Sequence, residues 1–99
     1  MGVESIKEER VKFKKPSKYK VILLNDNYTT VDFVLMVLTQ IFNYNLVEAQ
    51  EKAAEIHNKG KSTIGEFTYE VALTRITILD KLARENNYPL KAIMEKIND

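Results

Sequence analysis

VILLNDNYTT, residues 21–30, joins an apolar run to a cluster of small polar side chains, and the fold is best worked out from this junction. Residues 21–24 are all apolar and β-prone, which predicts a strand that is buried on both faces or central in a sheet. Asn and Asp are common in turns, so residues 25–28 predict a turn after this strand. A turn requires only some of these polar groups, and the others are candidates for a binding site.

Two helices are predicted after the turn. A Thr-x-x-Asp capping signature at Thr29 predicts a helix that begins there and ends near Asn43. An Asn-x-x-Glu signature at Asn45 predicts the next helix, with Gly60 as its end. Apolar residues recur at three-to-four spacing in both, as Val31, Val34, Leu35, Leu38, Ile41 and Phe42 in the first and Leu46, Ala49, Ala53 and Ile56 in the second.

The second half of the chain predicts strand, helix and strand. Residues 61–67 weakly indicate a short strand. A long helix is expected from Thr68 until Tyr88 and Pro89 stop it. Its predicted inward residues are Val71, Ala72, Ile76, Leu79, Leu82 and Ala83. Residues 90–97 alternate in character, which predicts a last strand, with a short helix as the alternative.

The elements follow one another in the order βααβαβ. This order predicts an α+β fold, a single compact domain over residues 19–99 in which a three-stranded sheet is covered by three helices. Residues 1–18 are mostly polar and charged, and they predict a flexible N-terminal arm.

The composition limits the environment and the size of the protein. At 99 residues the chain has the length of one domain, and it contains no cysteine, which excludes disulfides and thiolate zinc sites. It has no apolar run of signal-peptide length and none near the ~20 residues that span a bilayer. We therefore expect a soluble, cytoplasmic protein that does not bind membranes, and nothing in the sequence indicates more than a monomer.

The side chains available for chemistry argue against an enzyme. The chain has one histidine, no cysteine and no Gly-rich phosphate loop, and no pair of carboxylates has a spacing suited to acid–base catalysis. One histidine with scattered acids is not a metal-ligand set, so no metal and no cofactor are predicted. A hydrolase that used Asp26 and His57 would lack a nucleophile.

The basic stretch KFKKPSKYK, residues 12–20, raises the alternative of a nucleic-acid or ribosome-associated protein. Residues 1–20 carry seven Lys and Arg against three Glu, a net +4, and because the whole chain is +1 the remainder is −3. The net positive charge thus belongs to the arm, which favours a solvated segment over a nucleic-acid interface.

Three polar residues, Asn25, Asp26 and His57, remain without a clear role. Taken alone they are best interpreted as turn formers and a surface histidine. However, the segments VILLNDNYTTVDFV, AEIHNKGKSTIGEFT and ARENNYPL, in this order, resemble the ClpS family of protein-degradation adaptors over residues 18–96. Such adaptors bind the N-terminal residue of proteins marked for destruction and hand them to the ClpA unfoldase of the ClpAP protease.

The resemblance implies a two-part binding site. The α-amine of the bound N-terminus would contact Asn25, Asp26 and His57, which together offer three acceptors, one of them anionic, to its three N–H donors. The first side chain, from Phe, Tyr, Trp or Leu, would enter a pocket formed by Thr29, Val31, Val34, Ala53, Ile56 and Leu90. The N-terminal arm would engage the unfoldase.

The sequence departs from the family at four positions of this site. Asn27 and Thr30 stand where Asp and Pro are common, which removes a negative charge and a rigid turn residue. Val31 and Ala53 stand where Met is common, so the pocket has more room. We therefore expect a preference for Phe, Tyr and Trp over Leu.

Overall fold

The computed structural model describes residues 16–97, and it confirms the α+β fold and the order βααβαβ. The elements are β1 (Lys18–Leu24), α2 (Val31–Gln40), α3 (Leu46–Lys59), β2 (Lys61–Thr68), α4 (Tyr69–Glu85) and β3 (Lys91–Lys96). Most of the predicted arm, residues 1–15, lies outside the described residues. Within residues 16–97, no helix is long and apolar enough to cross a membrane.

β1 is the central strand of an antiparallel sheet with the order β2-β1-β3, as its continuous apolar run predicted. Leu23 lies opposite Ser62 on one neighbour and Ala92 on the other. The pairing with β2 shifts by one residue between Val21 and Ile22, so that β2 contains a bulge.

Gly65 lies beside this bulge for a steric reason. A Cβ atom on Gly65 would lie 2.7 Å from the tip of the Phe67 ring, closer than two carbon atoms can approach. The missing side chain lets the ring fold back over the strand and pack against the core. The glycine at position 65 therefore makes room for the Phe67 ring in the core.

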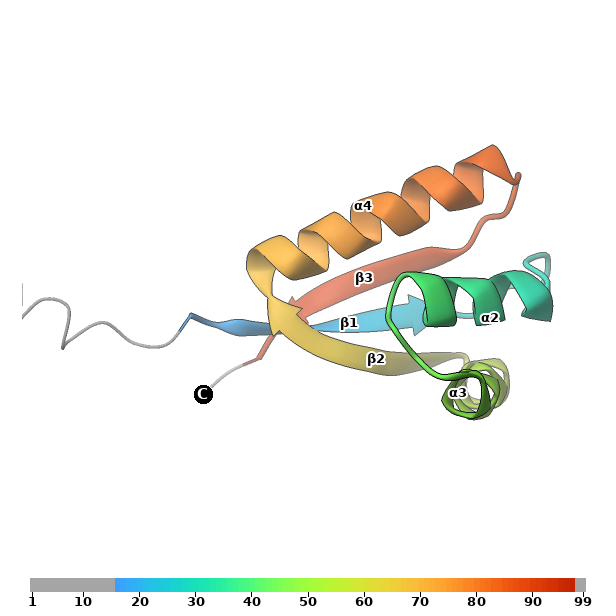
Figure 1. Cartoon of the computed structure of the whole chain (residues 1–99), viewed down its shortest axis with the longest axis horizontal. Helices are drawn as coiled ribbons and strands as arrows, with labels where there is room; N and C mark the ends of the chain where they lie inside the picture. Colours follow the sequence, from blue (N-terminus) through green and yellow to red (C-terminus); the bar gives the residue numbers. More distant parts are fainter. Residues whose placement is uncertain (1–15, 98–99) are drawn as a thin grey trace, which may run out of the picture.

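All three helices contribute side chains to one core on one face of the sheet. Val21 and Leu23 of β1 are fully buried in this core. Figure 1 shows α4 along β3, while α2 lies in front of β1 and α3 is seen nearly along its axis beside β2. The helical core residues are Phe33, Val37 and Leu38 from α2, Ala49 and Ile56 from α3, and Ala72, Leu79 and Ala83 from α4.

The start of α2 corrects one prediction. The N-cap is Thr30 and not Thr29, because the Thr30 hydroxyl accepts the Phe33 backbone N–H at 3.2 Å while the Thr29 hydroxyl is used within the turn. The helix also ends at Gln40, three residues before the predicted end. Thr30 thus caps α2 with its side chain, an interaction that a proline at this position could not make.

The other helix boundaries agree more closely with the sequence. Asn45 forms a complete capping box with Glu48, and Gly60 ends α3 in the left-handed conformation with φ 87°. β2 extends through Thr68, so that α4 begins one residue later than predicted and ends at Glu85, before Tyr88. Residues 91–96 form a strand and not a helix, which the alternation predicted first.

Three residues expected on buried helix faces are exposed instead. Val71 is 39% exposed because the buried stripe of α4 is centred on Ala72, Leu79 and Ala83. Leu46 at the first position of α3 is 58% exposed, and Val31 at the first position of α2 is 64% exposed. The first turn of a helix often extends past the elements that bury its later turns, so periodicity alone places these residues wrongly.

Candidate functional site

The turn between β1 and α2 is organised by the Asp26 carboxylate. Its Oδ1 accepts the backbone N–H groups of Tyr28 at 2.8 Å and Thr29 at 2.7 Å, and its Oδ2 accepts the Thr29 hydroxyl at 2.8 Å. Partial burial acts to raise the pKa of Asp26, but these hydrogen bonds from Thr29 and Tyr28 outweigh it and lower the pKa below its ordinary value. The turn therefore holds a fixed negative charge at neutral pH.

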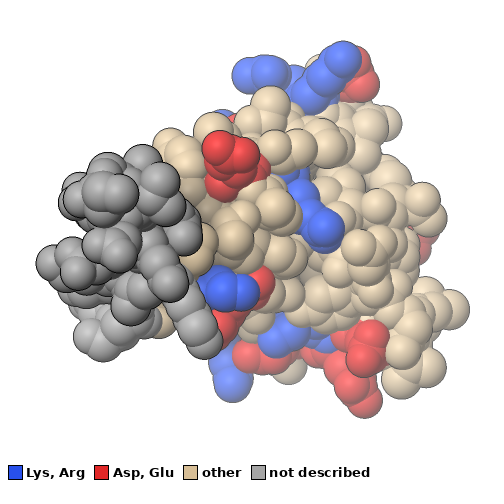
Figure 2. Space-filling model, turned by 60° about the vertical axis from the view of Figure 1, so that its left-hand side comes forward, with Lys and Arg blue, Asp and Glu red and all other residues tan. Residues whose placement is uncertain are grey.

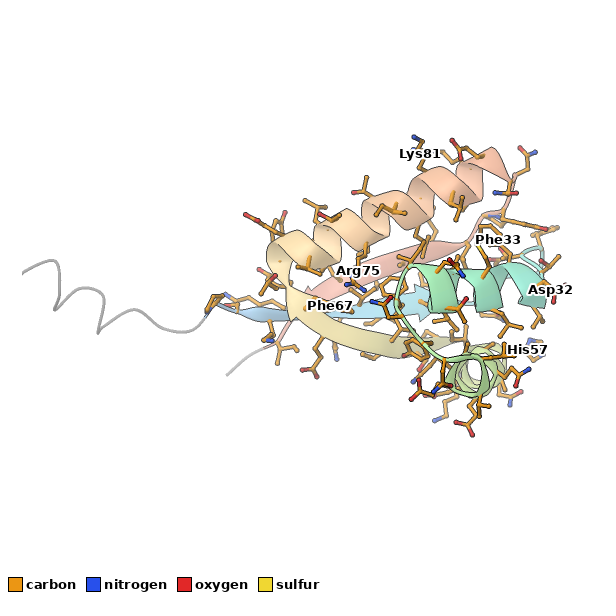
Figure 3. The ribbon with its side chains drawn as sticks, in the orientation of Figure 1. Asp32, Phe33, His57, Phe67, Arg75 and Lys81 are labelled. Carbon is orange, nitrogen blue, oxygen red and sulfur yellow. The ribbon has the colours of Figure 1, made fainter. Side chains whose placement is uncertain are left out.

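Asn25 connects this turn to the end of α3. Its backbone N–H donates to the carbonyl of Gly60 at 2.9 Å, three residues after His57. The Asn25 side chain is exposed, and no hydrogen bond to it is formed within residues 16–97. The fold thus brings two segments that lie more than thirty residues apart in the sequence to the same end of the sheet. Figure 3 shows His57 on α3 and Asp32 on α2 at this end.

An apolar groove lies between α2 and α3. Its volume is about 350 Å³, within the range of small-ligand sites. The residues that line it are Val31 and Leu35 of α2 and Gln50, Ala53, Ala54 and His57 of α3. It is therefore an apolar trough with the imidazole of His57 at one end and the amide of Gln50 near the other.

The structure places the predicted pocket residues in three different environments. Val31 and Ala53 line the groove, together with His57. Ile56 and Leu90 are only 2% exposed and belong to the core, and Val34 is half-buried against that core. Thr29 is half-buried in the turn, where it holds the Asp26 carboxylate.

Tyr88, two residues before Leu90, contacts the start of α2. The Tyr88 ring packs against Phe33, with 4.7 Å between ring centroids, and the Thr30 hydroxyl donates to the Tyr88 hydroxyl at 3.4 Å. The segment before β3 therefore packs against the first turn of α2.

Three groove residues were missed from the sequence, namely Leu35, Gln50 and Ala54. Helical spacing contained the signal, because Leu35 is four residues after Val31 and Gln50 is three before Ala53. Family resemblance alone did not include them.

A larger hollow of about 500 Å³ lies elsewhere, between Tyr44 and the outer side of α3. It is lined by the acids Glu48, Glu51 and Glu55. Glu48 is used in the capping box, and Glu55 pairs with Lys52 at 3.1 Å and Lys59 at 3.7 Å. Within residues 16–97, no cluster of His, Cys, Asp and Glu could hold a metal ion.

The charges on the visible surface are mixed. Figure 2 shows Lys and Arg interspersed with Asp and Glu on the described part of this face, with neutral surface between them. A nucleic-acid interface requires basic side chains gathered on one surface. The face in Figure 2 therefore gives no support to that alternative.

Comparison with known proteins agrees with this architecture. The solved structure of Agrobacterium tumefaciens ClpS2 bound to L-phenylalaninamide is similar to this chain with a TM-score of 0.80 and 29% sequence identity, over 84% of this chain and 100% of that one. The ATP-dependent Clp protease adapter protein ClpS of Acetivibrio thermocellus is 46% identical over 89 residues, which cover 90% of each chain. The ClpS of Escherichia coli O127:H6 is 44% identical over 98 residues, covering 97% of this chain and 92% of the relative.

The family match is equally broad. Residues 14–93 match the family described as "ATP-dependent Clp protease adaptor protein ClpS". This range contains every element of the described fold except the last residues of β3, and it includes the turn and the groove. By this match and by the identity to its relatives, the chain belongs to the ClpS family of Clp protease adaptor proteins.

Proposed function

We propose that this protein is an adaptor that binds the free α-amine and the bulky hydrophobic first side chain of N-degron substrates and delivers them to a ClpA-type unfoldase. The observation that carries the proposal is the apolar groove that ends at His57 of α3, the helix whose C-terminal Gly60 is hydrogen-bonded to Asn25 of the turn. L-phenylalaninamide, the ligand of the similar ClpS2, has a free α-amine and an aromatic side chain, the two features that this arrangement would accommodate.

The amine half of the site depends on acceptors and charge. The Asn25 amide oxygen and the lone pair of a His57 ring nitrogen can accept N–H groups of the ammonium. Asp26 has three of its roughly four acceptor positions occupied by the turn. Its main contribution is therefore the fixed negative charge that attracts the ammonium, with at most one direct hydrogen bond.

The apolar half would be the groove. Burying a Leu or Phe side chain is worth about 1.5–3 kcal/mol, which is too little for tight binding without the amine contacts. Val31 and Ala53, which line the groove, are smaller than the methionines that the family resemblance implies there, and small wall residues leave space for large ligands. We infer a preference for Phe, Tyr and Trp over Leu.

Fluorescence anisotropy with two peptides tests the binding step. One labelled peptide begins with Phe, and the other is identical but N-acetylated, which removes the charge and two of the three donors. Binding of the first peptide alone, with little dependence on salt, is the expected result. Equal binding of both would refute the proposal, and a steep loss of affinity with salt would indicate a different, electrostatic mode.

Delivery requires a second assay. Degradation of a substrate with an N-terminal Phe by a ClpA-type unfoldase and its protease should accelerate when this protein is added. The adaptor would have no catalytic step of its own, so degradation should still depend entirely on the unfoldase and protease.

A further inference from the structure

The far end of the groove carries a polar group for which the proposed function does not account. Gln50 lines the groove from the first half of α3, together with Leu35 of α2 and Ala54. These two neighbours are apolar, and the other polar lining residue, His57, lies toward the opposite end of α3. The Gln50 amide is thus the polar group at its end of an otherwise apolar groove.

Gln50 lies along the groove from His57, on the path that a large first side chain would take. The two residues are seven positions apart on α3, which is two helical turns or about 10 Å along the axis. Ala53 lies between them, about one turn from either residue. A residue whose amine is held at His57 would lay its side chain past Ala53, so the tip of an aromatic ring would approach Gln50.

The Gln50 amide is available for such a contact. The residue is exposed, and no hydrogen bond to its side chain is formed within residues 16–97. Its amide oxygen can accept a hydrogen bond and its NH2 group can donate one. A phenol hydroxyl could use either group, an indole N–H could use the oxygen, and a benzyl or isobutyl side chain could use neither.

We propose that Gln50 is a specificity-determining residue that recognises the polar tip of the first side chain, the hydroxyl of Tyr or the indole N–H of Trp. This inference rests on the proposed function, because it requires a first residue bound in the groove with its amine at His57. It extends that function, because Gln50 would distinguish first side chains by their hydrogen-bonding groups, whereas the apolar walls of the groove distinguish them by size.

The change in affinity that Gln50 would cause is small, because its hydrogen bond to the ligand replaces a hydrogen bond from the ligand to water. When a hydroxyl or indole N–H enters the groove it loses hydrogen bonds to solvent, and Gln50 replaces one of them. A net hydrogen bond between neutral groups changes affinity by roughly two- to tenfold. Because Gln50 is exposed and flexible, we expect about three- to fivefold.

The test compares four peptides that differ only in their first residue, Phe, Tyr, Trp or Leu. Their affinities are measured by anisotropy for the full-length protein and for Gln50→Leu, which keeps similar bulk but lacks the amide. Gln40→Leu is the matched control, because Gln40 is an exposed residue at the end of α2 that does not line the groove. Circular dichroism and thermal unfolding establish that both variants are folded.

In Gln50→Leu the affinity ratios Tyr/Phe and Trp/Phe should fall about three- to fivefold, while Phe and Leu bind as well as before or better. The ratios should be unchanged in Gln40→Leu. Unchanged ratios in Gln50→Leu, or an equal loss for all four peptides, would overturn the role of Gln50 and leave the proposed function intact. If the wild-type protein bound none of the peptides, the proposed function would fail and this inference with it.

Discussion

Replacing Ala53 with Met tests whether the width of the groove sets the preference for aromatic residues. Ala53 lines the groove midway along the wall contributed by α3 and is half-buried. Met extends three heavy atoms beyond the Ala side chain and would project into a space of about 350 Å³. Met is nearly as favourable as Ala within a helix, so the substitution should leave the fold unchanged.

The expected magnitude follows from the contacts that a ligand would lose. If the Met side chain occupies the space of about two methylene groups that an indole or phenyl ring would otherwise fill, the loss is about 1.5 kcal/mol at 0.8 kcal/mol for each group. This corresponds to roughly a tenfold weaker affinity for Trp-initiated and Phe-initiated peptides. A Leu side chain is shorter and would not reach that space, so its affinity should stay the same or increase.

The assay is a competition titration with Trp, Phe and Leu peptides against a labelled probe. Val47→Met is a suitable control, because Val47 lies on the same helix, is highly exposed and does not line the groove. If Ala53→Met weakened all three peptides equally or left the ratio of Trp to Leu affinity unchanged, the width of the groove would not set the preference.

Four further predictions follow from the turn, the histidine, the core and the arm. Asp26→Asn should lower the free energy of unfolding by about 1–2 kcal/mol at pH 7, because it removes charge-assisted hydrogen bonds at a site that solvent partly screens. The pKa of Asp26 is lower in the folded protein than its unfolded value of 3.8. The stability that the Asp26 carboxylate contributes is therefore present above pH 3.8 and is lost as the pH falls through the folded-state pKa. The free energies of unfolding of wild type and variant, measured by urea denaturation, should converge in acid. His57→Leu should weaken the affinity for a Phe-initiated peptide, because it removes one acceptor for the ammonium, and an unchanged affinity would exclude His57 as an acceptor. Arg75→Ala should reduce stability by about 1–2 kcal/mol and the Tm by several degrees, because Arg75 donates to the Ile41 carbonyl at 2.9 Å and lies 5.0 Å from the centre of the Phe67 ring; an unchanged Tm would contradict this. Deleting residues 1–15 should leave peptide affinity intact and abolish delivery to the unfoldase, and a truncated protein that still accelerates degradation would disprove this role for the arm.

Local signals determined most of the secondary structure. The capping box at Asn45, the glycine stop at Gly60 and the apolar run of residues 21–24 each act within one or two turns of helix or strand, and the structure agrees with all three. Neighbouring caps were harder to separate, since Thr29 and Thr30 are both able to cap a helix. Asp26 decided between them, because it takes the Thr29 hydroxyl and leaves that of Thr30 for the helix.

The site was predicted only in part from the sequence. Asn25, Asp26 and His57 attract attention as polar residues, but composition and spacing favour their roles as turn formers and a surface histidine, and the resemblance to a family was needed to group them. That resemblance also identified Val31 and Ala53, which line the groove, along with Ile56 and Leu90, which lie in the core.

The sequence by itself therefore determined the order of the elements, most of their ends and the family, because hydrophobic period, capping and motif spacing are properties of adjacent residues. Only the tertiary structure decided which residues share a surface. The Asn25–Gly60 hydrogen bond joins the turn to the end of α3, and the packing of α2 beside α3 makes Gln50 and Leu35 groove residues. The physical reason is that a groove is formed between two helices, and the rotation of each helix about its axis is set by the core that both must bury.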